Sequence, residues 1–340
     1  MRFLIFTTGG TIASVPTDEG LRPGLSGGQL LRAYPDLMGF DHDIEIIDVL
    51  SRDSSDMGPS DWLLLAERIR ESAPQGDAAV VLHGTDTMAW TASALSYMLN
   101  DVPIPVVLTG SMLTVDEPGS DVGDNIFAAV QFAMQMAMYR RRGVAVAFDG
   151  VLIHGPRAMK IDSRRKRAFV SVDYPLLGEM KDRETHKVAW LGRRVPKLSP
   201  ERPWTSPVLE TNVALVPIFP GMDARMLDAV LEARPRAVVL EAFGLGGVPE
   251  GLAAAVGRGL DGGIPFVLRT QSSFGGTDPS LYEVGRRVLD LGVLSARDMT
   301  REALMVKLML ILPLCAGRDG LERLLGVDLC DEGSGGDVLL

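Results

Sequence analysis

The stretch that decides the fold is Phe3-Leu-Ile-Phe-Thr-Thr-Gly-Gly-Thr-Ile-Ala-Ser14, in which a short apolar run leads into two glycines flanked by threonines. The apolar run does not alternate with polar residues, which is typical of a strand buried on both faces of a parallel sheet. The glycines permit a sharp turn and a close backbone approach. Because open α/β sheets bind ligands at the carboxyl ends of their strands, this turn could hold an anion or a developing oxyanion. An ordinary β-turn with a helix-capping threonine would explain the same residues.

The same order of strand and helix recurs along the chain. Further apolar runs bounded by Gly, Pro or Asp lie at 78–82, 106–108, 144–148, 213–217, 237–240 and 266–268. Segments with apolar residues at helical spacing lie at 61–72, 87–99, 125–139, 223–233 and 281–291. This alternation predicts an α/β protein with two domains, a larger one with a mostly parallel sheet flanked by helices and a smaller C-terminal α/β domain.

The domain boundary is expected where the periodicity stops. A segment rich in Pro and Arg predicts a linker at 192–212, between an N-terminal domain at 1–191 and a C-terminal domain at 213–340. The length of 340 residues fits two domains of about 100 to 200 residues each. The last ten residues, which are rich in glycine, are expected to fray.

Composition excludes several classes of protein. Apolar residues make up 46% of the chain, which argues against disorder. The formal net charge of −10 argues against a nucleic-acid partner. The N-terminus has no recognisable signal peptide, and no apolar run reaches the about 20 residues that cross a bilayer. Cys315 and Cys330 show neither a metal-binding nor a redox spacing, so we expect two thiols in a reducing cytoplasm.

Two further segments carry chemistry-bearing side chains. His83-Gly-Thr-Asp-Thr-Met88 follows the second apolar run and precedes a predicted helix, so Thr85 or Asp86 could simply cap that helix. Alternatively these side chains converge with the first turn, because a threonine hydroxyl is a weak nucleophile that needs a neighbouring base or cation. The third segment, Asp53-Ser-Ser-Asp-Met57, is either a capping loop or a binding site for a small zwitterion.

These segments together resemble the bacterial L-asparaginase family, closest to its cytoplasmic type I branch. The resemblance rests on Thr8-Gly-Gly-Thr-Ile-Ala13, His83-Gly-Thr-Asp-Thr-Met-Ala89 and Asp53-Ser-Ser-Asp-Met57, with Thr109-Gly-Ser111 and Asp298-Met-Thr-Arg-Glu-Ala303 in support. It extends from residue 3 to about residue 328. It implies a catalytic N-terminal domain and assembly into homodimers or homotetramers with sites beside a subunit interface.

The resemblance also implies roles for individual residues. Position by position, Thr11 corresponds to the nucleophile, and Thr85, Asp86 and Lys160 to the second catalytic group. Ser54 and Ser55 would hold the α-carboxylate of the substrate and Asp86 its α-ammonium group, with Gly10 and Gly84 beside them. The implied reaction converts L-asparagine to L-aspartate and ammonia through an acyl-enzyme, with minor activity on L-glutamine, and requires neither a metal nor an organic cofactor.

One segment departs from the family pattern. Residues 14–28, rich in glycine and proline, resemble the mobile lid of the family, in which a catalytic tyrosine usually follows a glycine. This chain has Leu21 at that position, and Tyr34 is the nearest tyrosine in the sequence. The substitution would lower the rate, move the nucleophilic role to Thr85 or mark a different substrate.

Two alternatives to an L-asparaginase stay open. An amino-acid-binding sensor with weak catalysis is the first, because of Leu21, although the set of Thr11, Thr85, Asp86 and Lys160 argues for an enzyme. The asparaginase-like subunit of an archaeal tRNA amidotransferase is the second; it needs an added domain before the Gly-Gly-Thr turn, and Met1 is expected to lie too close for one.

In the C-terminal domain, the loops at 241–249 and 270–273 correspond to loops that approach a neighbouring active site or an allosteric asparagine site in type I relatives.

Overall fold

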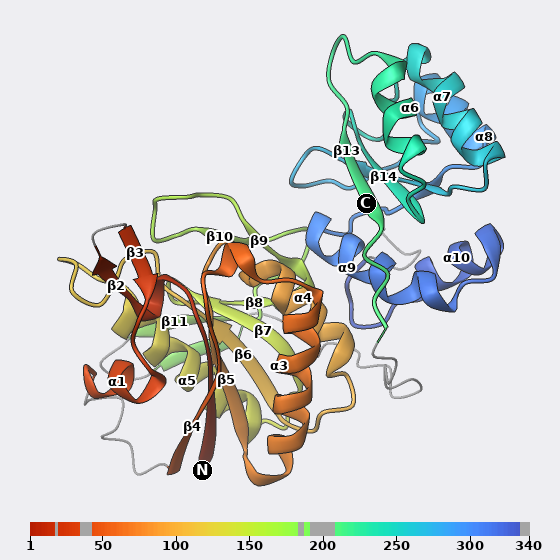
Figure 1. Ribbon diagram of the computed structural model, residues 1–340. Helices are drawn as coiled ribbons and strands as arrows, with labels where there is room; N and C mark the ends of the chain where they lie inside the picture. Colours follow the sequence, from red (N-terminus) through yellow and green to blue (C-terminus); the bar gives the residue numbers. More distant parts are fainter. Residues whose placement is uncertain (18–19, 35–42, 183–186, 191–207, 334–340) are drawn as a thin grey trace. The chain divides into compact units, whose positions relative to one another are not determined.

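Two mainly parallel sheets organise the chain, one in each of two units, Met1–Thr205 and Ser206–Leu340 (Figure 1). The computed structural model describes residues 1–17, 20–34, 43–182, 187–190 and 208–333. The α/β class and the pattern of a larger and a smaller domain predicted from the sequence are confirmed. Most of the expected linker at 192–212 lies outside the described residues.

The sheet of the first unit is parallel at its centre and antiparallel at one side. Its described strands run in the order β12-β11-β8-β7-β6-β5-β1-β4. The parallel strands are β1 (Arg2–Gly9), β4 (Asp43–Arg52), β5 (Ala78–Leu82), β6 (Pro105–Thr109) and β7 (Gly143–Phe148). The antiparallel strands are β8 (Val151–His154), β11 (Gly178–Asp182) and β12 (Lys187–Trp190). Strands β1, β5 and β6 coincide with the first apolar runs of the sequence.

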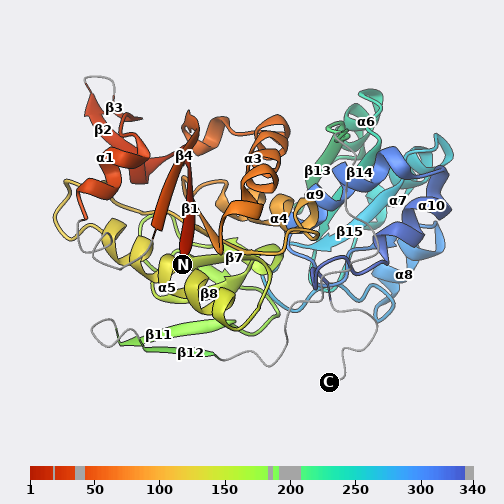
Figure 2. The same cartoon turned by 90° about the horizontal axis from the view of Figure 1, so that it is seen from below.

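Helices cover both faces of this sheet. They are α1 (Gly27–Arg32), α3 (Pro59–Ser72), α4 (Met88–Met98) and α5 (Val122–Met138). Alternate strand residues such as Ile5 and Val80 pack in one buried cluster with Phe132 of α5. Figure 2 shows α5 on the opposite face from α3 and α4. Strands with both faces covered need apolar residues at every position, which explains why their sequences do not alternate.

Two small hairpins lie outside the main sheet. Strands β2 (Ser14–Thr17) and β3 (Gly20–Pro23) pair antiparallel, and so do β9 (Ala158–Lys160) and β10 (Phe169–Ser171). The segment that resembles a lid therefore contains two strands and the first residues of α1. In its register the backbone of Leu21 pairs with Pro16, while the side chain of Leu21 lies outside the described residues.

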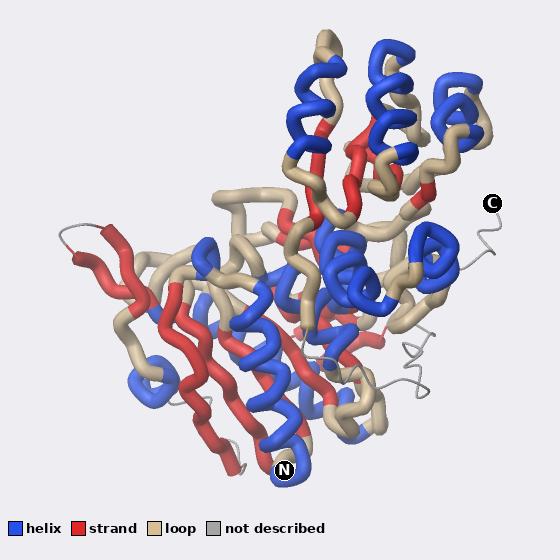
Figure 3. Tube along the Cα trace, turned by 45° about the vertical axis from the view of Figure 1, so that its right-hand side comes forward, coloured by secondary structure: helices blue, strands red, loops and turns tan. Residues whose placement is uncertain are grey.

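The second unit is a four-stranded parallel sheet with helices. Its strands are β13 (Val213–Pro217), β14 (Ala237–Ala242), β15 (Phe266–Thr270) and β16 (Leu294–Ser295), paired in that order. Its helices are α6 (Ala224–Glu232), α7 (Glu250–Asp261), α8 (Glu283–Asp290), α9 (Arg301–Ile311) and α10 (Gly317–Leu325). Figure 3 shows α6, α7 and α8 side by side, and Leu227, Val256 and Val288 from these helices pack against strand residues in one cluster.

The expectation that the last ten residues fray is wrong for residues 331–333. Glu332 is fully buried and accepts a hydrogen bond of 2.5 Å from Nζ of Lys307, which is itself buried in α9. The ammonium also donates to the carbonyl oxygens of Leu325 (2.9 Å) and Val327 (2.6 Å). Because removing either partner would leave a buried charge unpaired, this pair holds the segment in place. Residues 334–340 lie outside the described residues.

Two smaller expectations concern membranes and thiols. In the described part of the chain, none of the helices combines the length and the apolarity that a bilayer span needs. Cys315 and Cys330 form no disulfide, in agreement with their spacing in the sequence.

The carboxyl group of Asp328 predicts a pH dependence of stability. Burial and the hydrogen bond to Glu332 raise the pKa of Asp328 to about 7, so the folded state binds a proton that the unfolded chain releases near pH 4. The free energy of unfolding therefore falls as the pH rises from 4.5 to 7.5. Asp328→Asn removes this titration, and we expect wild type to lose about 1 to 2 kcal/mol more than the variant over that range in urea denaturation.

Asp319→Asn, an exposed residue of α10, is the matched control and should show the pH dependence of wild type. Parallel stability curves of wild type and Asp328→Asn would contradict the assignment.

Candidate active site

Strands β1, β5 and β6 end at the same level of the sheet. Thr7 of β1 pairs with Leu82 of β5, and Leu82 pairs with Thr109 of β6. The loops that follow these strands therefore start beside one another at the carboxyl edge. The Gly-Gly-Thr turn and the His83–Thr87 loop, about 70 residues apart in the sequence, become neighbours because of this register.

A contact between two glycines brings these loops together. Gly10 has φ = 81°, and a Cβ atom on it would clash with Cα of Gly84. Only a residue without a side chain fits that gap, and only glycine adopts such a φ without strain. The N–H of Gly10 donates to the carbonyl of Arg52 at 2.9 Å, which ties the turn to the end of β4 as well.

The serine loop is the third component of the site. Ser54 starts a short 3-10 turn, Ser54–Asp56, capped by the carboxylate of Asp53. A Cβ atom on Gly84 would lie 2.6 Å from Oγ of Ser54, so these two residues are in direct contact. The hydroxyl of Thr87 also donates to the Ser54 carbonyl at 2.7 Å. Ser54 is buried whereas the next residue, Ser55, is exposed.

Lys160 joins the site from the hairpin of β9 and β10. Its Nζ donates to Oγ1 of Thr85 at 2.8 Å and to Oδ1 of Asp86 at 2.6 Å. The side chain of Lys160 is only 16% exposed, whereas that of Asp86 is 64% exposed. The ammonium therefore lies between a buried hydroxyl and a carboxylate that reaches solvent. The residues around Lys160 do not single it out by themselves, because it lies 75 residues from Thr85 in the chain, and only the family resemblance names it.

Thr11 begins the short 3-10 turn Thr11–Ala13 directly after the glycine contact. Ile12 and Ala13 are buried, while Thr11 is partly exposed. The hydroxyl of Ser14 donates to the Gly10 carbonyl at 2.8 Å and closes the turn. Among the described residues, the Thr11 hydroxyl makes no hydrogen bond.

The residues singled out in the sequence thus form two groups of contacting residues, and the remaining two are next to these groups in the chain. Gly84 touches both Gly10 and Ser54, and the ammonium of Lys160 bonds to both Thr85 and Asp86. Thr11 and Ser55 follow directly in the chain. Hydroxyls beside a cation, with backbone N–H groups in a glycine turn, suit attack on a carbonyl group and stabilisation of the oxyanion that forms. Among the described residues, no cluster of His, Cys, Asp or Glu suits a metal ion.

Sequence reasoning did not identify two groups that support these loops. The carboxylate of Asp61 on α3 accepts from Arg52 Nη1 at 3.3 Å and from the Gly58 N–H at 2.9 Å, so it connects the end of β4 with the end of the serine loop. His83 contacts Thr91 of α4. The local sequence around each residue does not distinguish a supporting group from an ordinary capping or core residue.

Tyr34 is the tyrosine nearest in sequence to Leu21, but its contacts lie at the start of α5. Its ring packs on Gly123 at the start of α5, and its hydroxyl bonds to Ser120. Burial raises the pKa of Tyr34, and Asp116 and Asp121 add to this effect. These contacts anchor the end of α1 to α5.

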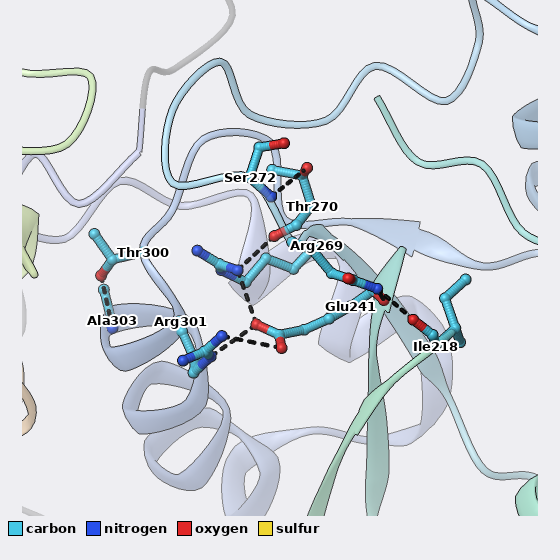
Figure 4. A network of polar contacts seen from close by, with 9 residues as sticks. Ile218, Glu241, Arg269, Thr270, Ser272, Thr300, Arg301 and Ala303 are labelled. Carbon is cyan, nitrogen blue, oxygen red and sulfur yellow. Dashed lines mark hydrogen bonds and ion pairs between the residues drawn. The ribbon is translucent and has the colours of Figure 1, made fainter. Parts of the chain in front are cut away.

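In the second unit, residues at the start of the two candidate loops take part in a network of polar contacts and ion pairs (Figure 4). The carboxylate of Glu241 accepts from Nη1 of Arg269 at 2.8 Å and from Nε of Arg301 at 2.7 Å. Gln271 donates to the carbonyls of Ile218 and Glu241. The charge of Glu241 is therefore neutralised within its own unit, and Thr270 caps the following turn through the N–H of Ser272.

Comparison with known proteins gives consistent matches over nearly the whole chain. The family model "Asparaginase, N-terminal" matches residues 2–192, and "Glutaminase/Asparaginase C-terminal domain" matches residues 212–325. An L-asparaginase of Thermococcus kodakarensis is 38% identical over 91% of this chain and 92% of its own length. A subunit of the glutamyl-tRNA(Gln) amidotransferase of Methanopyrus kandleri is 34% identical over 98% of this chain and 75% of its own length.

Solved structures show the same architecture. The thermostable L-asparaginase from Thermococcus kodakarensis aligns with a TM-score of 0.90 and 36% identity, covering 98% of this chain and 100% of that one. L-asparaginase I from Vibrio cholerae aligns with a TM-score of 0.82 and 27% identity, covering 98% and 99%.

The glycine contact predicts a large effect of one methyl group. In Gly84→Ala the new Cβ would meet Ser54 Oγ at 2.6 Å and Gly10 Cα at 3.0 Å, so the loops must separate. We expect a loss of about 1 to 3 kcal/mol in the free energy of unfolding, measured in urea, together with loss of ligand binding at this edge.

Gly28→Ala is the matched control, because nothing lies within 4 Å of its Cβ position in α1. It should be neutral or stabilise by up to about 1 kcal/mol. Equal stability of Gly84→Ala and wild type would show that the loops are not packed this closely.

Proposed function

The chain belongs to the asparaginase family, and we propose that it is an L-asparaginase that hydrolyses L-asparagine to L-aspartate and ammonia. The observation that carries the proposal is the ammonium of Lys160, held at 2.8 Å from the Thr85 hydroxyl and 2.6 Å from Asp86 in loops that also contain the Gly10–Gly84 contact. This arrangement provides a polarised hydroxyl and a carboxylate beside a glycine turn, which are the groups that amide hydrolysis requires.

The substrate is proposed to bind through its charged α-groups. Ser54 and Ser55 offer hydroxyl and backbone donors to the α-carboxylate, and the exposed carboxylate of Asp86 accepts from the α-ammonium group. Gly10 and Gly84 pack directly against each other and so fix the spacing of the two loops beside which the substrate is proposed to bind. With both α-groups held, the side-chain amide is oriented toward the turn that contains Thr11.

In the first chemical step, Oγ of Thr11 attacks the amide carbon and the C–N bond breaks. The hydroxyl proton passes to the leaving nitrogen, which departs as ammonia, and an ester between Thr11 and the aspartyl group remains. Backbone N–H groups of the glycine turn, or of Thr85 and its neighbours, stabilise the oxyanion of the tetrahedral intermediate.

In the second step, a water molecule attacks the ester carbon. Thr85 accepts a proton from this water while it passes its own hydroxyl proton on toward Oγ of Thr11, so it stays neutral, and the ammonium of Lys160 with Asp86 holds the Thr85 hydroxyl in place. The ester bond then breaks, the proton returns to Oγ of Thr11, and L-aspartate leaves. The residues named need neither a metal nor an organic cofactor for these steps.

Specificity, assembly and location form part of the proposal. L-glutamine is expected as a minor substrate, because one extra methylene changes binding by only about 1 to 3 kcal/mol. A homodimer or homotetramer in the cytoplasm is proposed from the sequence resemblance.

The assay that tests the function measures ammonia released from L-asparagine, L-glutamine and D-asparagine by the purified chain alone, without tRNA or a second protein. Thr11→Val removes the proposed nucleophile while keeping the shape, so we expect turnover of L-asparagine to fall by at least about a thousandfold.

The matched control is Thr7→Val on β1, the strand that precedes the turn of Thr11, because the Thr7 hydroxyl bonds to Asp48 at 2.6 Å. It should retain turnover. Retained activity in Thr11→Val would exclude the nucleophilic role, and no turnover by wild type, with L-asparagine still raising the melting temperature, would favour the sensor.

A second prediction concerns the position where the family usually has a tyrosine. A tyrosine hydroxyl there would assist Thr11 by hydrogen bonding, so Leu21→Tyr should raise kcat for L-asparagine several-fold. Steady-state kinetics of wild type and Leu21→Tyr, with Leu21→Phe as the control that adds the ring without the hydroxyl, measure the effect. A kcat that is unchanged or lower in Leu21→Tyr would show that the site compensates for the leucine in another way.

A further inference from the structure

His83 is buried directly beneath the loop that carries Thr85 and Asp86. It is 0% exposed, its Nδ1 lies 2.7 Å from the carbonyl oxygen of Gly84, and its Nε2 lies 2.9 Å from Oγ1 of Thr91. Thr91 is also 0% exposed and lies in α4, the helix that follows the loop. The imidazole ring therefore connects the loop with the helix.

The chemistry of the two partners defines the state of the ring. A carbonyl oxygen can only accept, so Nδ1 must carry the proton. In the neutral ring Nε2 is then an acceptor, and the hydroxyl of Thr91 donates to it. Burial lowers the pKa of His83 to about 4, so the ring stays neutral at physiological pH.

The carbonyl that accepts from His83 Nδ1 belongs to Gly84, a residue with close contacts on two sides. Gly84 touches both Gly10 and Ser54, and its carbonyl lies in the peptide plane that also contains the N–H of Thr85. The His83 N–H donates to the Thr109 carbonyl at 2.8 Å, and a Cβ atom on Gly110 would clash with the His83 carbonyl oxygen. The residue before Gly84 is thus fixed by both its backbone and its side chain.

We propose that His83 is a positioning residue which, together with Thr91, sets the orientation of the Gly84–Thr85 peptide and thereby of the Thr85 hydroxyl and N–H. The inference rests on the proposed function and adds two residues that support the reacting groups of its site without contacting the substrate. Any buried imidazole needs partners for both nitrogens, and the identity of these partners gives this ring its role. Here one nitrogen bonds to the adjacent peptide and the other to the first turns of α4, so the ring transfers the rigidity of the helix to the loop.

The decisive variants are made at Thr91, because they remove one hydrogen bond and leave the ring in place. Thr91→Val keeps the shape and deletes the donor to Nε2, whereas Thr91→Ser keeps the hydroxyl. Ser93→Ala is the matched control: Ser93 is also 0% exposed on α4, but its hydroxyl bonds to the Ala89 carbonyl of the same helix at 2.9 Å.

We expect Thr91→Val to lower kcat for L-asparagine by about 10- to 100-fold with KM changed less than about threefold, because misorientation of the Thr85 peptide affects the chemical step more than the serine loop that holds the substrate. Thr91→Ser and Ser93→Ala should keep kcat within about twofold of wild type. Thermal melts of all three variants show whether the fold is retained.

The ring itself provides a readout that does not depend on turnover. Long-range ¹H–¹⁵N NMR of the imidazole should show the neutral Nδ1-protonated form of His83 between about pH 5.5 and 8, and in Thr91→Val the Nε2 resonance should shift as its hydrogen bond is lost. An Nε2-protonated or charged ring at pH 7 would overturn the proposal, as would wild-type kcat in Thr91→Val. No ammonia release by wild type would instead overturn the proposed function together with this role.

Discussion

The site depends on a contact between two backbones, that of Gly10 after strand β1 and that of Gly84 after strand β5. No side chain fits between them, so the turns before Thr11 and Thr85 can pack against each other directly. The parallel register places Thr7, Leu82 and Thr109 at one level and makes the contact possible. The neighbouring groups, Ser54 against Gly84 and Arg52 against Gly10, are held in place by the same contact.

Charged groups in the molecule have two different functions. In the second unit, Glu241 with Arg269, and Lys307 with Glu332, form buried ion pairs, and the partly exposed Arg301 adds a second guanidinium to Glu241. Such pairs hold segments together. Lys160 differs, because it is mostly buried and its carboxylate partner Asp86 reaches solvent. A partly exposed pair beside the Thr85 hydroxyl remains open to substrate, which is why the chemistry is assigned to this group.

Much of the fold could be predicted because its strands are buried on both faces. The continuous apolar runs at 78–82 and 213–217 coincide with β5 and β13, and the helical spacing at 61–72 lies within α3. The antiparallel strands β8, β11 and β12 and the hairpin of β2 and β3 were not predicted. These strands are only four or five residues long, too short for a clear period, and nothing in their own residues specifies an antiparallel partner. The buried end of the chain at Glu332 was missed because its partner, Lys307, lies 25 residues earlier.

By itself, the sequence determined the α/β class, the family resemblance and the residue types that could catalyse the reaction, since these depend on local patterns and on motifs a few residues long. The tertiary structure alone decided that Lys160 meets Thr85 and Asp86, that Ser54 touches Gly84, and that His83 connects its loop to Thr91. These contacts join segments whose distance in space is set by strand register and helix packing. No local pattern encodes that distance, because it results from the burial of the whole sheet.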